Sequence, residues 1–197
     1  FLNSRKFTIL VYHGVSTRDR TTGIRNYGGN HLAVAKFAKQ IKYLSKHRNV
    51  LPLTNVIELL NRGQKIPQGT IAITFDDGYR SFYMLAWPIL KQLGIPATVF
   101  LTTRWINDRE MLWFDKIEYA IEHINDCESI EIQMDGRSLR YPIKSMTEKI
   151  RTCYRIKELC KSVDNNIRES IVEELGKLCG NNFNILPDDD CTPLSWN

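Results

Sequence analysis

Residues 70–78 read TIAITFDDG and decide the fold. A short β-rich run comes first, and the adjacent acids Asp76 and Asp77 follow it directly. Successive side chains on a strand point to opposite faces, so two neighbouring carboxylates within a strand would put one charge into a core. The conflict disappears if the pair lies just past the strand end, where Gly78 lets the backbone turn away. The segment therefore predicts a buried strand that ends in a carboxylate pair.

A carboxylate pair at the end of a buried strand has two interpretations. Buried carboxylates are costly unless they are paired or bound to a cation, which favours a metal site or an acid–base site. Asp and Gly are also ordinary turn residues, so the segment could be a strand-to-helix turn in which an Asp caps the next helix. Both interpretations stay open on these residues alone.

The sequence on either side of this segment alternates between strand and helix patterns. Strands are expected over residues 7–12, 50–53, 70–75 and 97–101, and helices over 31–46, 55–61 and 81–93. Pro88 should either kink the last helix or start a second one. This alternation predicts an α/β fold with a parallel sheet or barrel. We expect the strands near 7–11, 70–75 and 97–101 to be parallel neighbours, with these side chains buried: Ile71, Ile73, Val99 and Leu101.

The pattern changes after about residue 104. Helices are expected over 112–123, 147–163 and 165–179, with a hairpin of strands 129–134 and 138–141 around an Asp-Gly turn. This part reads as a mainly helical α+β insertion. The predicted organisation is a core over 1–104, an insertion over 105–190 and a return toward the core over 191–197.

Composition excludes several classes of function. The net charge of +5 comes from scattered Lys and Arg, without a basic stripe interleaved with aromatics, so nucleic acid is not an expected partner. No apolar stretch reaches the roughly 20 residues of a membrane helix, so no transmembrane segment is expected. The five cysteines contain no Cys-x-x-Cys pair and read as buried free thiols. Oligomeric state stays open.

A histidine ends one predicted strand as the aspartates end another. His13 follows the strand over 7–12, and chemistry in parallel α/β sheets and barrels gathers at the carboxyl ends of strands. If the two strands are neighbours, one imidazole and two carboxylates converge at one edge. The alternative for His13 is a structural hydrogen bond that closes its strand.

Several motifs in order resemble one known family. YHGV at 12–15, TFDDGYRS at 74–81, PILK at 88–91 and GIPATVF at 94–100 resemble a NodB-type polysaccharide deacetylase of carbohydrate esterase family four. The resemblance spans about residues 7–103. It implies the N-terminal part of a distorted (β/α) barrel and a hydrolase that removes N-acetyl groups from amino sugars with a divalent metal. One oxygen ligand and two imidazoles suit zinc. By position, Asp76 matches the catalytic general base and Asp77 the metal-ligating aspartate.

The chain departs from the family pattern at the metal site. The family supplies two histidines as His-x-x-x-His, but no two of His13, His31, His47 and His123 have that spacing. Residues 194–196 resemble a Leu-Ser-Trp stretch that comes shortly before this motif, and the chain starts with Phe1. We therefore expect a fragment that lacks the remaining metal ligands and is itself inactive. The family favours the cell envelope or an extracytoplasmic location.

The expected partner is a carbohydrate. Trp105 and Trp113 flank the start of the insertion and are candidates to stack on sugar rings. His13 is a candidate to support the metal ligands or to bind substrate. The main alternative is a catalytically silent carbohydrate-binding or structural relative. A metal–phosphate site ranks last because no Gly-rich phosphate loop follows a strand.

Overall fold

The computed structural model describes residues 7–18, 23–125, 127–134, 136–180, 183 and 191–196. The chain divides into two compact units. The first comprises Phe1–Arg20, Gly29–Arg109 and Asp188–Asn197, and the second Thr21–Gly28 and Glu110–Pro187. The domain limits drawn from the sequence, 1–104, 105–190 and 191–197, stay a prediction.

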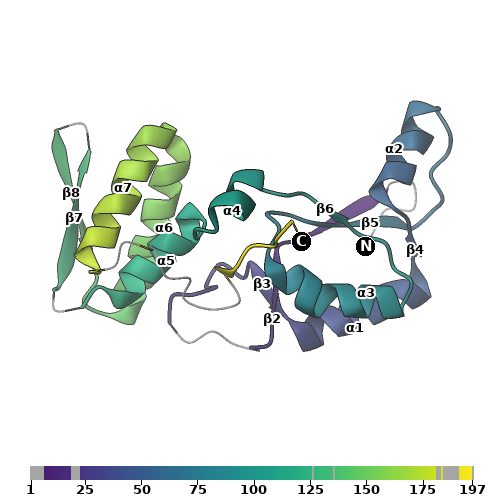
Figure 1. Cartoon of the computed structure of the whole chain (residues 1–197), viewed down its shortest axis with the longest axis horizontal. Coiled ribbons are helices and arrows are strands. Elements are labelled where there is room, and N and C mark those ends of the chain that lie inside the picture. Colours follow the sequence, from purple (N-terminus) through teal and green to yellow (C-terminus); the bar gives the residue numbers. More distant parts are fainter. Residues whose placement is uncertain are drawn as a thin grey trace. The chain divides into compact units, whose positions relative to one another are not determined.

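The first unit is built on a parallel sheet centred on β5 (Figure 1). One edge of β5 (Thr70–Phe75) pairs with β1 (Thr8–Tyr12) along its whole length. Its other partners are β4 (Asn49–Val50) at its start and β6 (Thr98–Val99) at its end, both parallel. The predicted α/β class and the adjacency of the three strands are confirmed. Closure into a barrel stays a prediction, because the described residues supply four strands of this sheet.

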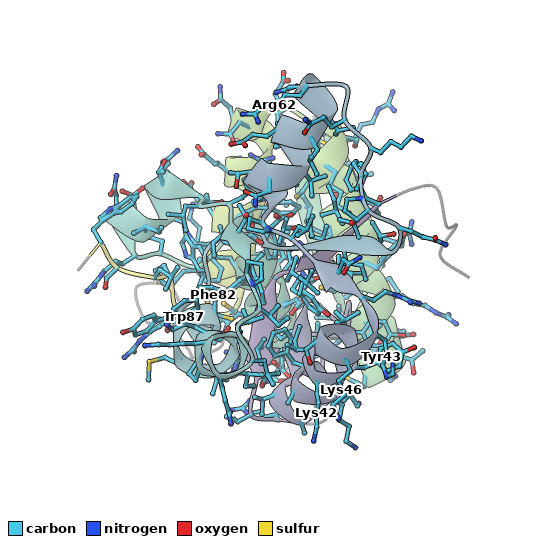
Figure 2. The ribbon with its side chains drawn as sticks, turned by 90° about the vertical axis from the view of Figure 1, so that its right-hand side faces the viewer. Lys42, Tyr43, Lys46, Arg62, Phe82 and Trp87 are labelled. Carbon is cyan, nitrogen blue, oxygen red and sulfur yellow. The ribbon has the colours of Figure 1, made fainter. Side chains whose placement is uncertain are left out.

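Helices cover the face of the sheet to which Ile71, Ile73 and Phe75 belong. They are α1 (Val34–His47), the π-helix η1 (Phe82–Ala86) and α3 (Trp87–Gln92). α1 buries Phe37, Ile41 and Leu44, an apolar stripe with helical spacing. Lys42, Tyr43 and Lys46 lie on its outer side (Figure 2). Phe82 and Trp87 come from the η1–α3 segment, where Pro88 lies in the first turn of α3, as one of its two predicted roles required.

Some predicted boundaries of the first unit were wrong. The helix expected over 31–46 begins at Val34, because His31–Ala33 forms β3, which pairs in parallel with β2 (Gly14–Ser16). The strand expected over 97–101 is only two residues long, and Leu101 is exposed and Val99 only half-buried. The chain turns there into the short helix α4 (Thr103–Asp108).

The helix α2 (Leu53–Asn61) also begins earlier than expected. Asn55 and Val56 donate their amides to the carbonyl of Pro52, so the helix starts behind this proline. Thr54 therefore lies inside the first turn of α2.

The second unit contains three helices and a hairpin, as the pattern predicted. The elements are α5 (Trp113–His123), β7 (Ser129–Met134), β8 (Arg137–Pro142), α6 (Met146–Ser162) and α7 (Asn165–Leu178). The helices pack on one another, and α6 and α7 contact the hairpin. Ser145 and Glu148 form a reciprocal capping box at the start of α6. Cys153 and Cys160 are buried free thiols.

A loop from early in the sequence packs within the second unit. Glu118 of α5 accepts a hydrogen bond from the amide of Asn26 (2.9 Å) and forms a short ion pair with Lys157 of α6. Arg25 lies 3.9 Å from Glu122, one turn further along α5. Sequence patterns gave no sign of this placement, since it depends on contacts between residues about 90 positions apart.

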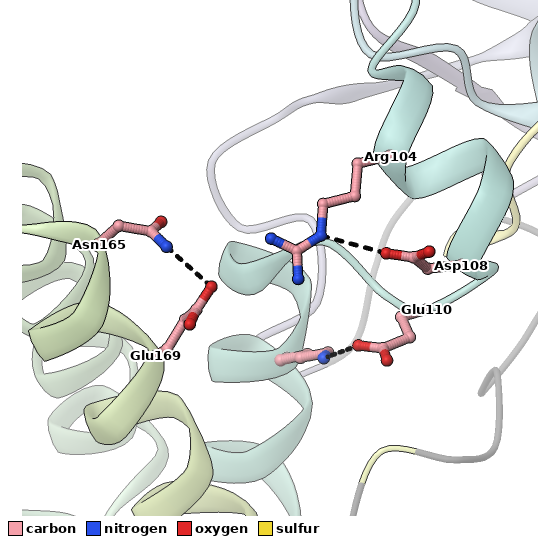
Figure 3. A network of polar contacts seen from close by, with 6 residues as sticks. Arg104, Asp108, Glu110, Asn165 and Glu169 are labelled. Carbon is pink, nitrogen blue, oxygen red and sulfur yellow. Dashed lines mark hydrogen bonds and ion pairs between the residues drawn. The ribbon is translucent and has the colours of Figure 1, made fainter.

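Contacts at the surface are of a different kind. Arg104 donates to Asp108 within α4 (3.1 Å), and Asn165 donates to Glu169 within α7 (2.8 Å). Both pairs are drawn in Figure 3. Lys116 of α5 pairs with Glu110, which precedes that helix, at 2.6 Å. Such exposed contacts contribute little to stability. Within the described ranges, no helix combines the length and apolar character needed to cross a membrane.

Candidate functional site

The carboxylate pair lies in a tight turn at the carboxyl end of β5. Every residue of β5 is buried, and the ladder with β1 ends where the amide of Asp76 donates to the carbonyl of Tyr12 (2.9 Å). The amide of Gly78 then donates to the carbonyl of Asp76 (2.9 Å), which makes residues 76–78 a γ-turn. Asp77, at its centre, has a φ of +70°. This conformation is strained for a residue with a side chain, and such strain concentrates at functional sites.

Two segments hold the turn from outside. The carbonyl of Asp77 accepts from the amide of Thr102 (3.0 Å), just after β6, and that of Gly78 accepts from the amide of Leu194 (2.9 Å). Gly78 has a φ of +91°, and a Cβ built on it would lie 2.8 Å from Leu101 Cδ2. Backbone hydrogen bonds and a close contact thus fix the conformation of the turn that carries Asp76 and Asp77. The expectation that Gly78 supplies the turn is confirmed by its geometry.

His13 lies between β1 and β2, at the same edge of the sheet. Tyr12 and Phe75 are partners in the β1–β5 register, so His13 and Asp76 are the next residues on neighbouring parallel strands. Both side chains are half-buried. The structure thus places His13, Asp76 and Asp77 at the same edge of the sheet, and their roles stay a prediction.

The electrostatics of the pair centre on Asp77. Partial burial raises the pKa of the Asp77 carboxyl, the positive charge of His13 opposes the rise, and the neighbouring carboxylate of Asp76 adds to it. His13 is therefore near enough to interact with Asp77. The Asp77 carboxyl at this edge is therefore harder to ionise than an exposed one.

These residues do not by themselves complete a metal site. Across the part of the chain that the structure describes, no group of three or more His, Cys, Asp or Glu side chains could hold a metal ion. Catalytic zinc sites use three protein ligands and keep a further position open. Asp77 fits as one carboxylate ligand, and the described residues do not fit a full zinc centre.

The two tryptophans differ in exposure. Trp105 on α4 is buried in the first unit, with its ring 4.8 Å from that of Tyr79 in an edge-on contact. Its indole nitrogen has no hydrogen-bond partner among the described residues. Stacking of a sugar on Trp105 does not fit this burial. Trp113 begins α5 in the second unit, half-buried, with the guanidinium of Arg168 5.3 Å from its ring centre.

Sequence reasoning missed the residues that support His13. The amide of Val15 donates to the buried hydroxyl of Ser81 (3.1 Å). Gly14 lies so close to His31 that a Cβ would meet its ring nitrogen Nδ1 at 1.9 Å. Ser81 stands inside the motif TFDDGYRS, but a serine at the start of a helix reads as an ordinary cap.

Comparison with known proteins finds similarity to polysaccharide deacetylases. Residues 63–138 match the family model described as polysaccharide deacetylase. YxkH of Bacillus subtilis, a protein assigned by name to the polysaccharide deacetylases, is 30% identical over 128 residues, which are 63% of this chain and 42% of that protein. These matches confirm the resemblance drawn from the motifs: residues 63–138 are similar to the polysaccharide deacetylase family.

A second relative has a more specific name. The poly-β-1,6-N-acetyl-D-glucosamine N-deacetylase of Staphylococcus aureus is 34% identical over 95 residues, which are 48% of this chain and 31% of that protein. The matched part thus spans less than half the length of each of these relatives.

Solved structures of deacetylases are similar as well. The de-N-acetylase from Aggregatibacter actinomycetemcomitans is 18% identical with a TM-score of 0.45, over 76% of this chain and 50% of that one. IcaB from Ammonifex degensii is 26% identical with a TM-score of 0.43, over 51% of this chain and 40% of that one.

Proposed function

We propose that this protein is a metal-dependent hydrolase that removes N-acetyl groups from N-acetylglucosamine residues of a polysaccharide. The observation that carries the proposal is the strained Asp76–Asp77 turn beside His13, inside the family-matched part of the chain. A catalytically silent relative has no need of a half-buried, mutually repelling carboxylate pair, because such a pair destabilises the fold.

A poly-β-1,6-linked N-acetylglucosamine chain is the substrate that the relatives favour. The Staphylococcus aureus relative is named for this polymer and matches 48% of the present chain. We carry that substrate class over as the first one to test, with β-1,4-linked chito-oligosaccharides as the alternative.

Asp77 and Asp76 have different roles in this proposal. Asp77, strained and partly buried, contributes one ligand to a divalent metal, which would polarise the acetyl carbonyl and acidify a water molecule. The other ligands would come from outside the described residues. Asp76 takes the proton from the attacking water, so that a new carbon–oxygen bond forms at the acetyl carbon.

His13 is suited to the second proton transfer. The carbon–nitrogen bond breaks easily only if the departing nitrogen receives a proton, and an imidazole can supply one near neutral pH. The products are acetate and a free amino sugar. In this proposal His13 transfers a proton to the substrate, whereas the sequence led us to expect that it supports the metal ligands or binds substrate.

Acetate release tests the proposal. The full-length protein encoded by the gene is loaded with zinc and given oligomers of β-1,6- or β-1,4-linked N-acetylglucosamine, and a chelator should abolish the release. We expect the unaltered protein to release acetate from the β-1,6 polymer. The Asp76→Asn variant should release acetate from neither polymer. Binding of oligomers without any acetate release would support the silent relative instead. The 197-residue chain alone should bind zinc weakly and release negligible acetate, because its described residues offer too few ligands.

A further inference from the structure

The backbone on both sides of His13 is held by hydrogen bonds to other segments. Before it, the carbonyl of Tyr12 accepts from the amide of Asp76 (2.9 Å). After it, the amide of Gly14 donates to the carbonyl of Asn30 (3.1 Å), in the parallel pair of β2 with β3. His13 itself lies in neither strand. Its position therefore depends on how β2 is anchored relative to β5.

The hydroxyl of Ser81 provides such an anchor. It accepts a hydrogen bond from the amide of Val15 at 3.1 Å. Val15 comes two residues after His13, and both Val15 and Ser81 are buried. Ser81 comes four residues after Asp77 and directly precedes η1, which contacts β2. One side-chain bond thus joins the segment that carries the imidazole to the segment that carries the carboxylates.

The fit around this bond leaves β2 little freedom. Gly14 packs closely against the ring of His31. The His31 ring in turn makes an edge-on contact with the ring of Tyr79, with 4.6 Å between the ring centres. Tyr79 and Ser81 belong to the same stretch that leaves the Asp76–Asp77 turn. Val15 is fully buried in the core of the first unit. Removal of the hydroxyl would leave a buried amide without its acceptor, which the fold can relieve only by moving β2 or by admitting water.

We propose that Ser81 is a positioning residue that holds His13 in register with Asp76 and Asp77 for the second proton transfer. The inference rests on the proposed function and names a residue outside the metal site and outside the reacting groups. Its hydroxyl is already the acceptor for Val15, so it acts through the backbone of β2 and not by touching substrate.

The test compares three variants of the protein. Ser81→Ala removes the acceptor, whereas Ser81→Thr keeps a hydroxyl at the same position. Thr152→Ala is the control, because the buried hydroxyl of Thr152 also bonds to a backbone group, the carbonyl of Pro142 (2.7 Å), but lies in the second unit. The measurements are amide exchange at Val15, the ring NMR signals of His13, and kcat, KM and bound metal of the full-length protein.

We expect Ser81→Ala to speed exchange at Val15 and to shift and broaden the His13 signals. Its kcat should fall about 10- to 100-fold, the usual effect of a misplacement near 1 Å, while KM and bound metal stay constant. Ser81→Thr should restore kcat, and Thr152→Ala should lower stability without changing the His13 signals. If the extra methyl of Ser81→Thr prevents folding, a backbone ester in place of the Val15 amide removes the donor and should reproduce Ser81→Ala.

Two outcomes would overturn the inference. One is unchanged His13 signals and kcat in Ser81→Ala. The other is a loss of kcat that Thr152→Ala matches at equal stability. Failure of the proposed function looks different: acetate release would then be absent from the parent or insensitive to Asp76→Asn. The exchange and NMR measurements still decide whether Ser81 holds His13 in that case.

Discussion

Tyr12 and Phe75 lie opposite each other in the β1–β5 pair, with their rings stacked 5.3 Å apart. Because the strands are parallel, the residues that follow them, His13 and Asp76, leave the sheet at the same edge. The stacked rings belong to an aromatic group at the core that includes Phe37 and Phe82. Core packing therefore sets the distance at which the candidate proton donor and base can work together.

Asp76 and Asp77 should have separable roles. Asp77→Ala should remove bound metal and acetate release together, since it deletes a ligand. Asp76→Asn should keep the metal but slow turnover by about two to four orders of magnitude, the usual contribution of a general base. Metal analysis and acetate assays on the full-length variants check this. Loss of metal only in Asp76→Asn would reverse the roles, and no effect of either change would leave the pair as a turn.

Gly78 should matter for both stability and turnover. Gly78→Ala places a Cβ at a φ of +91° and 2.8 Å from Leu101 Cδ2, which should cost about 1–3 kcal/mol and disturb the carboxylates. Gly94→Ala is the control, because Gly94 also has a positive φ, of +62°, but has open space around it. Thermal unfolding should show a lower stability in both variants. Only Gly78→Ala should also lower acetate release, and equal activity in the two would contradict this account.

The partly buried ion pair of the second unit should contribute more to stability than a surface pair. Glu118→Ala would leave the half-buried Lys157 without its partner and the amide of Asn26 without its acceptor, at a cost of about 1–3 kcal/mol. The exposed pair of Glu128 and Lys144 supplies the control, and Glu128→Ala should cost at most about 1 kcal/mol. Urea unfolding of the 197-residue chain measures both. Equal losses of unfolding free energy in the two variants would contradict this account of Glu118.

Cys153 should make stability fall at alkaline pH. Burial raises the pKa of its thiol from 9.0 to about 12. The stability that this shift contributes is fully present below pH 9 and is lost as the pH rises toward 12, because the unfolded chain ionises first. Unfolding curves between pH 8 and about 11 should show this slope, and Cys153→Ala should reduce it.

Thiol labelling gives an independent check on the same burial. At pH 8 the exposed Cys127 should react rapidly, and Cys153 only on unfolding. Rapid labelling of Cys153 in the folded protein would contradict its burial.

Much of the first unit could be predicted because local patterns and long-range packing agree there. The run at 70–75 is β-rich and fully buried, and the stripe of Phe37, Ile41 and Leu44 has helical spacing, so pattern and core coincide. Short elements failed for the opposite reason. The residues of β3 read as the start of a helix, but pairing with β2 overrides that preference.

The candidate site also has features that the sequence predicts and features that only the folded chain decides. The sequence by itself determined which groups are candidates for chemistry, because two carboxylates follow one buried strand and a histidine follows its neighbour. It could not determine their arrangement. The positive φ of Asp77, the hold of Thr102 and Leu194 on its turn, the bond from Val15 to Ser81 and the burial of Trp105 are decided by the tertiary structure. Each depends on contacts between segments distant in sequence, whose hydrogen bonds and close packing exist only once the chain is folded.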